Sequence, residues 1–394
     1  MLMTPAARIA AAAEILDQIR DGTPATKALV IWGRSSRFAG SGDRRAIRDL
    51  VYDALRCRRS AACLGGGETG RALMLGLLRA SGTNPDTVFT GSGHAPALLT
   101  ADEALGGGRP ETPGERTDLP DWLVPLFEDA FGTGWEQAAN TLRERAPVFL
   151  RVNALKTTLE QAITDLSSSE ISASAHSGAE TALKVVQGAR KIAQSAAYLN
   201  GLVELQDVSS QAAVASISIR NGMKVLDYCA GGGGKTLAMA ARVDANYFCH
   251  DIAPARMADM PARAERAGAT VTLLSTDQVG SLAPFDIVLC DAPCSGSGSW
   301  RRDPEGKWAL TEERLEALCA TQDEILDQAA LLVGPKGVLA YATCSVLRAE
   351  NEARIAAFIE RNAGWIVTLE QRFGMDGEGD GFFVAHLTRC DMGS

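Results

Sequence analysis

DYCAGGGGKT, residues 227–236, follows a short apolar run and precedes a helical pattern, which is typical of a turn between a strand and a helix. Glycines in such a turn allow backbone N–H groups to approach a bound ligand closely. A P-loop would need glycine where this chain has Cys229, and a dinucleotide fingerprint counted from Gly231 would need glycine where it has Thr236. Both patterns fail, so the turn predicts a nucleotide-like cofactor that is held in another way.

Short apolar runs alternate with helical stretches from about Gly222 onward. Strands separated by helices predict a mostly parallel sheet that is covered on both faces and binds ligands beyond its carboxyl strand ends. The expected strands are 224–226, 247–250, 270–274, 286–290, 338–343, 365–369 and 382–387. Five groups with useful chemistry fall at or just past strand ends: Asp227, Asp251, Asp277, Asp291 and Cys344.

The acids at these strand ends narrow the choice of cofactor. Asp251 comes 20 residues after Gly231, at the end of the second strand, and is placed to accept hydrogen bonds from both ribose hydroxyls. Asp277, at the end of the third strand, is placed to accept one from an adenine amino group. This combination suits S-adenosylmethionine better than NAD.

Nine cysteines are scattered along the chain without framework spacing, which predicts reduced thiols and a cytoplasmic protein. Cys290 and Cys294 lack the partner pair that a zinc site would need, so we expect no metal. Cys294 and Cys344 stand apart because Pro, Gly, Ser and Thr surround them at strand ends. The alternative is a purely structural role, in which both are small buried residues. Spacing alone does not decide which of the two is a nucleophile.

Thiolates beside such a cofactor suggest methyl transfer to a pyrimidine ring. Cytosine C5 is too weak a nucleophile to take a methyl group directly, but attack of a thiolate on C6 makes C5 reactive. An acid near N3 would stabilise the adduct, and Asp291 lies at the right strand end. The target base would have to leave its stack to reach this pocket.

Charge and hydropathy indicate whether the chain is expected to contact a membrane or a nucleic acid. The net charge is −9, and no run approaches a membrane span or a signal peptide. Residues 34–59 nevertheless hold eight arginines and three aspartates, a local charge of +5. This stretch is either a solvated helix face or a contact for a nucleic-acid backbone.

The first half of the chain has a different organisation. Residues 4–105 have a helical pattern, in which Ile47, Leu50, Val51 and Leu55 share one stripe. A linker rich in Gly and Pro follows at 105–114, and a small α+β unit begins near Leu119 with a helix at 122–131, a strand at 148–152 and a helix at 159–166. Residues 167–178 are expected to form a loop.

Residues 227–236, 291–308 and 342–352 resemble the motifs of the RNA (cytosine-5)-methyltransferases of the NOL/NOP/Sun family, above all its bacterial 16S rRNA branch. The resemblance implies three domains: a NusB-like all-α RNA-binding domain at 1–110, a small α+β domain at 115–215, and a Rossmann-like class I methyltransferase domain at 216–394. The last would hold a mostly parallel, seven-stranded sheet. The expected partner is RNA, specifically 16S rRNA, with no membrane, and the expected state is a monomer.

The family motifs assign roles to individual residues. Cys344 matches the nucleophile and Cys294 the cysteine that assists product release, with Asp291 as the third catalytic residue. The RNA-facing side of the pocket would be lined by Arg301, Arg302, Asp303, Pro304 and Trp308. Core packing is the alternative role for Trp308. The implied contacts of S-adenosylmethionine, whose product is S-adenosylhomocysteine, are Asp227, Cys229, Ala230, Gly231, Gly232, Gly233, Gly234, Lys235, Asp251, Arg256, Asp277, Asp291 and Pro293.

The sequence departs from the family motif at one place, and several alternative functions stay open. The family has Ala-Pro where this chain has Gly231-Gly232, which predicts a more flexible loop and weaker cofactor binding. A tRNA substrate is the main alternative within the same chemistry. A DNA cytosine-5 enzyme would use Cys294 as its nucleophile, a non-catalytic rRNA-binding assembly factor would not bind the cofactor, and an NAD-dependent oxidoreductase lacks its third glycine.

Overall fold

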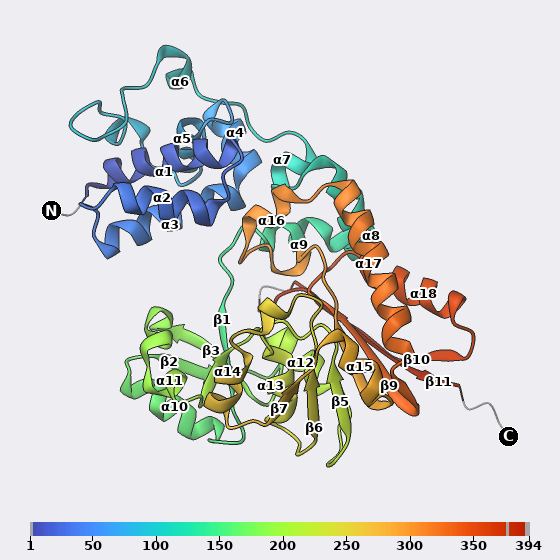
Figure 1. The fold of residues 1–394 in the computed structure, drawn as a ribbon. Coiled ribbons are helices and arrows are strands. Elements are labelled where there is room, and N and C mark those ends of the chain that lie inside the picture. Colours follow the sequence, from blue (N-terminus) through green and yellow to red (C-terminus); the bar gives the residue numbers. More distant parts are fainter. Residues whose placement is uncertain (1–2, 376–377, 391–394) are drawn as a thin grey trace. The chain divides into compact units, whose positions relative to one another are not determined.

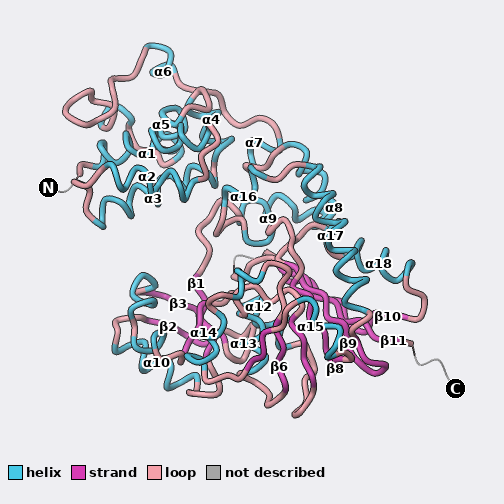
Figure 2. The backbone as a smooth tube through the Cα atoms, viewed as in Figure 1, coloured by secondary structure: helices cyan, strands magenta, loops and turns pink. Residues whose placement is uncertain are grey.

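The computed structural model describes residues 3–375 and 378–390. Its contacts divide the chain into two compact units. The helical unit holds residues 1–145 together with 300–310, and the α/β unit holds residues 146–299 together with 311–394. Figure 1 shows both units coloured along the chain, and Figure 2 separates their helices from their strands. The division into three domains at 1–110, 115–215 and 216–394 stays a prediction.

The helical unit forms around amphipathic helices. In α3 (Ser41–Arg56), Ile47, Val51 and Leu55 recur at helical spacing and are buried, as the sequence predicts. They join apolar side chains of the neighbouring helices in one core. The other helices of this unit are α1 (Pro5–Arg20), α2 (Ala25–Ser35), α4 (Arg58–Gly65), α5 (Gly70–Ala80), α6 (Ala101–Leu105), α7 (Pro113–Thr117), α8 (Val124–Phe131), α9 (Trp135–Thr141) and α16 (Pro304–Ala309).

The α/β unit begins with a small antiparallel sheet of order β2-β3-β1-β4. Its elements are β1 (Val148–Val152), α10 (Leu159–Ser168), β2 (Ser172–Ala175), β3 (Ala182–Gln187), α11 (Ala196–Leu199) and β4 (Val203–Leu205). The expectation of a loop at 167–178 is wrong, because β2 lies within it. Ser172 and Ser174 hide the strand from hydropathy, and its backbone pairing with β3 is what defines it.

The large sheet has the order β10-β11-β9-β8-β5-β6-β7. Neighbours from β9 to β7 run parallel, while β11 pairs antiparallel with both β9 and β10. The expected mostly parallel, seven-stranded sheet is therefore confirmed. The strands are β5 (Lys224–Asp227), β6 (Asn246–Cys249), β7 (Val271–Leu273), β8 (Phe285–Asp291), β9 (Val333–Thr343), β10 (Trp365–Phe373) and β11 (Phe382–Arg389).

Alternating residues of the strands send side chains to opposite faces of this sheet, and helices cover both. Leu226, Val288 and Tyr341 pack in a core with α15, α17 and α18. Their sequence neighbours Val225 and Ala340 pack in a second core with α12 and α13. The helices of this unit are α12 (Val208–Ala215), α13 (Gly234–Ala240), α14 (Met260–Ala267), α15 (Thr276–Leu282), α17 (Glu312–Ala330) and α18 (Glu352–Arg361).

The pairing register brings the predicted strand ends to one edge. Asp291 ends β8 opposite Ala342 of β9, and Asp227 ends β5 opposite Leu289 of β8. The loops that leave β5, β8 and β9 therefore begin side by side. Among residues 3–375 and 378–390, no helix has the length and apolar character needed to cross a membrane.

Candidate active site

Two cysteine sulfurs meet at this edge of the large sheet. Cys294 follows the end of β8 by three residues, and Cys344 directly follows β9. Because these strands are parallel neighbours in matched register, the Sγ atoms lie 3.4 Å apart, within hydrogen-bonding distance. The loops are joined further by the Gly298 N–H, which donates to the Cys344 carbonyl at 3.0 Å. The arrangement favours two thiols that act on one substrate over two independent buried residues.

The environment makes the two thiols unequal. A hydrogen bond from the Cys294 thiol lowers the pKa of Cys344 and outweighs the effect of burial, and the Lys235 ammonium acts in the same direction. The same hydrogen bond, together with burial, raises the pKa of Cys294. Cys344 is therefore the better thiolate, and Cys294 is its proton-bearing partner.

Lys235 and Asp291 form an ion pair beside the cysteines. The Lys235 Nζ atom lies 2.6 Å from Asp291 Oδ2 and 5.0 Å from the centre of the Phe382 ring. Burial alone would lower the pKa of Lys235, but the ion pair with Asp291 outweighs it and raises the pKa. A permanent positive charge is thus fixed near the thiol of Cys344.

The glycine turn is shaped by its surroundings. Gly231 and Gly233 have φ of +50° and +78°, a region that glycine adopts readily. A Cβ atom at Gly233 would lie 1.9 Å from the Met260 sulfur, whereas one at Gly234 would meet nothing within 4 Å. The Gly231 N–H donates to Asp251 Oδ2 at 3.0 Å, so the carboxylate after β6 holds the turn in place.

A cavity of 220 Å³ opens beside this turn. Tyr228 and His250 stack on one another in its lining, and their ring centres are 4.8 Å apart. Asp251 also lines the cavity, where its Oδ2 pairs with the mostly exposed Arg256 at 3.0 Å. The remaining lining residues are Cys229, Ile252, Pro293, Thr321, Glu324, Ile325 and Gln328.

The cavity fits the predicted cofactor. Aromatic and apolar walls together with the Asp251 carboxylate suit an adenosine group. Asp227, which is not among the lining residues, is a second buried carboxylate at the end of β5. Thr236 donates to Asp227 Oδ2 at 2.6 Å, but among the described residues Oδ1 has no hydrogen-bond partner. Burial raises the pKa of Asp227 to about 7. Its orphaned oxygen is suited to a donor group of a bound ligand.

The cavity lining contains four of the predicted cofactor contacts: Cys229, Asp251, Arg256 and Pro293. Asp227, residues 230–235, Asp277 and Asp291 are not among the lining residues, and Asp277 is exposed in the first turn of α15. Glu350 is a site residue that sequence patterns do not reveal, and its carboxylate contacts both cysteine loops. The sequence does show that a serine follows each cysteine. Only the fold shows that both serines contact the same distant acid.

Residues 300–310 belong to the helical unit, although the sequence continues from the Cys294 loop. Glu305 accepts from the N–H of Ala25, the first residue of α2, at 3.0 Å. The last turn of α3 is capped by two donors: Lys307 Nζ bonds the Arg56 carbonyl at 3.2 Å, and Trp308 Nε1 bonds that of Leu55 at 2.7 Å. This segment therefore satisfies backbone groups that helix ends leave open.

Two of the five residues that were expected on the RNA-facing side of the pocket are buried. Arg301 and Pro304 are buried, with Arg301 only 1% exposed, so neither side chain forms a solvent-facing wall. Trp308 is half-buried and donates to the Leu55 carbonyl, while Arg302 and Asp303 are exposed. The family pattern could not reveal this, because the segment's partners come from a part of the chain about 250 residues earlier.

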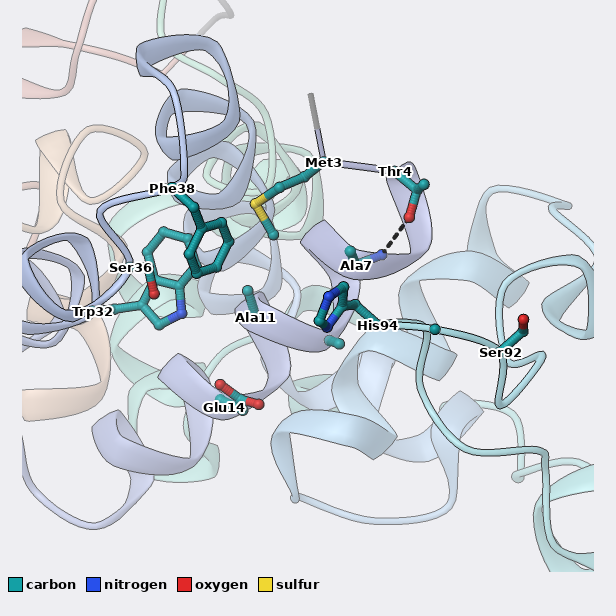
Figure 3. A pocket seen from close by; sticks show the side chains of 12 residues that line it. Met3, Thr4, Ala7, Ala11, Glu14, Trp32, Ser36, Phe38, Ser92 and His94 are labelled. Atoms are coloured by element: carbon teal, nitrogen blue, oxygen red, sulfur yellow. Dashed lines mark hydrogen bonds between the residues drawn. The ribbon is translucent and has the colours of Figure 1, made fainter. Parts of the chain in front are cut away.

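The arginine stretch is only partly available for a ligand. Arg56, Arg58 and Arg59 are engaged by acids, and Arg44 donates to backbone carbonyls. Arg34 and Arg37 are exposed, and within 3–375 and 378–390 neither has a polar partner. The helical unit also has a groove of 610 Å³, lined by Met3, Thr4, Ala7, Ala10, Ala11, Glu14, Trp32, Ser36, Phe38, Ser92, Gly93 and His94 (Figure 3).

Comparisons with known proteins agree with this geometry. The family model of the 16S rRNA methyltransferases RsmB/F matches residues 214–388, and the model of the ferredoxin-like domain of RsmF/B-like methyltransferases matches residues 119–191. Ribosomal RNA small subunit methyltransferase B of Citrobacter koseri is 32% identical over 284 residues, which cover 68% of this chain and 66% of that protein. The match thus spans slightly less than two thirds of the relative's length.

Solved structures show the same fold. The crystal structure of PH0851 has a TM-score of 0.75 at 23% identity and covers 98% of this chain and 99% of its own. The structure of NSun6 from Pyrococcus horikoshii with SFG has a TM-score of 0.61 at 18% identity and covers 69% of this chain and 98% of its own. Sheet order, cavity and likeness together define a Rossmann-like methyltransferase fold.

Within that class, the chain belongs to the RsmB/F family. The family resemblance expected from the sequence is therefore confirmed. No group of three or more His, Cys, Asp or Glu side chains in the described part of the chain is placed to hold a metal ion.

Proposed function

We propose that this protein transfers a methyl group from S-adenosylmethionine to C5 of a cytosine in RNA, with 16S rRNA as the substrate. The observation that carries the proposal is the pair of sulfurs 3.4 Å apart beside the Lys235–Asp291 ion pair. A single nucleophile needs no second thiol at this distance. A nucleophile and a group that assists its later release do need one.

The residues have separate tasks in this reaction. The Cys344 thiolate attacks C6 of the cytosine and forms an S–C6 bond, and Asp291 stabilises the adduct through N3. S-adenosylmethionine, when bound, would supply an electrophilic methyl group to C5, with S-adenosylhomocysteine as the leaving group. A base then removes the C5 proton, and the electron pair expels the Cys344 thiolate as the C5–C6 double bond returns. Cys294 assists this release.

The cofactor would occupy the cavity beside the glycine turn. Residues 229–235 would surround its amino-acid portion together with Asp227, while Asp251 would accept from the ribose. Arg256, which now pairs with Asp251, would have to share that carboxylate or turn away. Its side chain is 60% exposed, so this movement meets little packing resistance. Asp277 would contact the adenine from its exposed place on α15.

The choice of 16S rRNA over tRNA rests on the relatives, which are named ribosomal RNA small subunit methyltransferases. A NusB-like character of residues 1–110, a middle domain at 115–215 and a methyltransferase domain from 216 are parts of the same proposal, as are a monomeric state and a cytoplasmic location. Arg34 and Arg37 would contact the RNA backbone, where they position the substrate without reading its sequence.

A denaturing gel with labelled 16S rRNA and S-adenosylmethionine tests the function. Wild type should incorporate methyl groups without a persistent adduct. Cys344→Ala should do neither, because no S–C6 bond can form. Cys294→Ala should leave a protein–RNA band that survives denaturation, because release is blocked.

The same gel separates the alternatives. A shifted band with tRNA but not with rRNA would move the substrate to tRNA. An adduct in Cys344→Ala and none in Cys294→Ala would exchange the two roles, as in a DNA-type enzyme. Failure of wild type to bind S-adenosylmethionine would support a non-catalytic binding protein.

A further inference from the structure

One buried carboxylate connects the two cysteine loops. Each cysteine is followed directly by a serine, and both serine hydroxyls donate to Glu350 Oε2, each at 2.5 Å. The Ser295 N–H donates to Oε1 at 2.7 Å. Glu350 is fully buried, and its carboxylate accepts in all of these hydrogen bonds.

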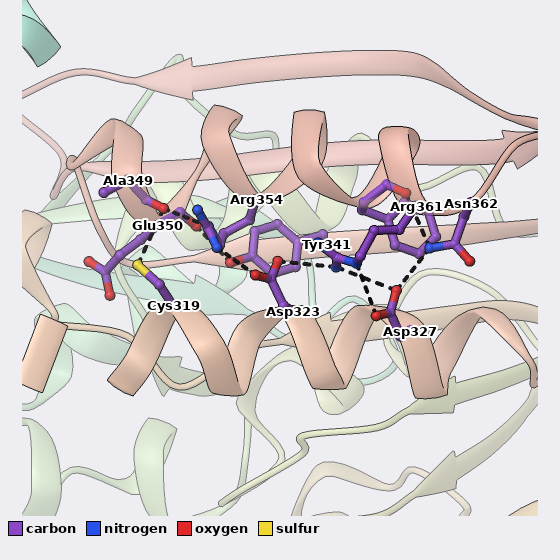
Figure 4. A network of polar contacts seen from close by, with 10 residues as sticks. Cys319, Asp323, Asp327, Tyr341, Ala349, Glu350, Arg354, Arg361 and Asn362 are labelled. Atoms are coloured by element: carbon purple, nitrogen blue, oxygen red, sulfur yellow. Dashed lines mark hydrogen bonds and ion pairs between the residues drawn. The ribbon is translucent and has the colours of Figure 1, made fainter. Parts of the chain in front are cut away.

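The backbone of Glu350 is fixed from the opposite side (Figure 4). Tyr341 of β9 donates its hydroxyl to the Glu350 carbonyl at 2.7 Å. Arg354 of α18 bonds the carbonyl of Ala349 at 2.8 Å and is itself held by Asp323 of α17 at 2.5 Å. Because β9, α17 and α18 together hold the backbone at Glu350, its side chain has little freedom to move.

Other contacts between the loops are neutral and weaker. The Ser297 and Ser345 hydroxyls lie 2.9 Å apart, and Ser297 Oγ accepts from the Val346 N–H at 2.9 Å. These bonds can keep the loops folded without Glu350. The carboxylate adds charge-assisted bonds to the residue that directly follows each sulfur-bearing side chain, where a small shift moves the sulfurs most.

We propose that Glu350 is a positioning residue which holds the Cys294 and Cys344 loops in register and so sets the distance between their sulfur atoms. The effect on catalysis rests on the proposed function, whereas the effect on the thiols does not. Without this register, Cys294 would no longer donate reliably to Cys344, and the nucleophile would be both less ionised and less well aligned.

The direction in which the alkylation rate of Cys344 changes distinguishes a positioning role of Glu350 from a purely electrostatic one. The titratable groups that act on Cys344 are Cys294, Asp291, Lys235 and Glu350. Removing the negative charge of Glu350 would by itself lower the pKa of Cys344 and speed its alkylation. Losing the hydrogen bond from Cys294, which has the larger influence, would raise the pKa and slow alkylation.

The test compares Glu350→Gln with wild type by iodoacetamide labelling across pH, with each cysteine followed by peptide mass spectrometry. We expect Cys344 to react about tenfold more slowly near neutral pH, as for a pKa increase of about one. Ser295→Ala, which leaves the Glu350 charge in place, should change the rate in the same direction. Glu352→Gln, which loses only the ion pair with Arg372, is the matched control and should behave like wild type.

Methyl transfer provides the second readout. Misplacement of a nucleophile by about 1 Å can cost about 10²-fold, so kcat of Glu350→Gln should fall by that order while KM for RNA stays within about twofold. Circular dichroism and thermal unfolding establish that each variant is folded. If Glu350→Gln does not fold, Ser295→Ala carries both readouts.

Unchanged or faster alkylation of Cys344 in folded Glu350→Gln and Ser295→Ala would overturn the proposal. A proportional rise in KM with unchanged kcat would also contradict it, because that points to substrate binding. If wild type does not methylate RNA, the proposed function fails, yet the alkylation comparison still decides whether Glu350 positions the thiols.

Discussion

The sulfur atoms of Cys294 and Cys344 lie 3.4 Å apart although 50 residues separate them in the chain. Adjacent parallel strands bring them together: β8 and β9 end level with one another, and each cysteine sits in the turn that follows. Close approach gives the pair a shared proton, so the ionisation of one thiol depends on the other. The pair therefore has to be tested as a unit.

Lys235→Met should make Cys344 a poorer thiolate. The ammonium of Lys235 lowers the pKa of Cys344, and its loss also leaves the negative charge of Asp291 unopposed, which raises that pKa further. Alkylation of Cys344 should therefore require a higher pH, with a rate near neutral pH reduced about tenfold or more. Labelling rates against pH measure this, with the exposed Lys336→Met as control. An unchanged profile would show that Lys235 does not act on the thiol.

Gly233→Ala should destabilise the α/β unit by about 1–3 kcal/mol. A methyl group there would collide with the Met260 sulfur in a backbone conformation that alanine disfavours. Gly234→Ala is the matched control, because it has open space and begins α13, where alanine is the better helix former. Urea unfolding of both variants gives the comparison. Equal stability of the two would contradict the predicted crowding.

Restoring Ala-Pro at 231–232 should not simply stiffen the cofactor loop. Gly231 has φ of +50°, and a Cβ atom there would lie 3.2 Å from the guanidinium of Arg256. Gly231→Ala should therefore cost about 1 kcal/mol or more of stability rather than improve cofactor binding. Calorimetric titration with S-adenosylmethionine measures cofactor binding, and thermal unfolding measures stability. Tighter binding with unchanged stability would contradict this prediction.

Arg34→Ala with Arg37→Ala should weaken RNA binding. Both residues are exposed, as is Phe38, which directly follows Arg37 and is 70% exposed. Each lost phosphate contact should reduce the slope of log affinity against log salt by roughly 0.7 to 0.9. Filter binding at several salt concentrations checks this, and Lys336→Ala controls for the loss of surface charge. An unchanged slope would remove both residues from the RNA contact.

Trp300→Ala should loosen the helical unit. Trp300 is buried, and its ring lies 6.4 Å from that of Phe127, so truncation should cost about 3–5 kcal/mol. Trp308→Phe should cost only about 1 kcal/mol, because it removes one hydrogen bond to the end of α3. Hydrogen exchange should rise in α3 and α8 while β8 and β9 stay protected. Uniform exchange across the chain would contradict a local role.

The sequence by itself determined the seven strands of the large sheet and the identity of most groups at its carboxyl edge. Apolar runs, the glycine turn and the two Cys-Ser motifs are local signals, because backbone conformation and burial depend first on neighbouring residues. Ser172 and Ser174 show the limit of such signals, since a half-exposed polar strand is defined only by its partner.

Tertiary structure decided the relations between distant residues. The 3.4 Å contact of the sulfurs, the unequal thiol pKa values and the carboxylate of Glu350 shared by two loops arise from strand register. The same holds for residues 300–310, which follow the Cys294 loop in sequence but cap helices of the helical unit. Hydrogen bonds and electrostatic interactions act over a few ångströms in space, and no local pattern encodes which remote groups will be that close.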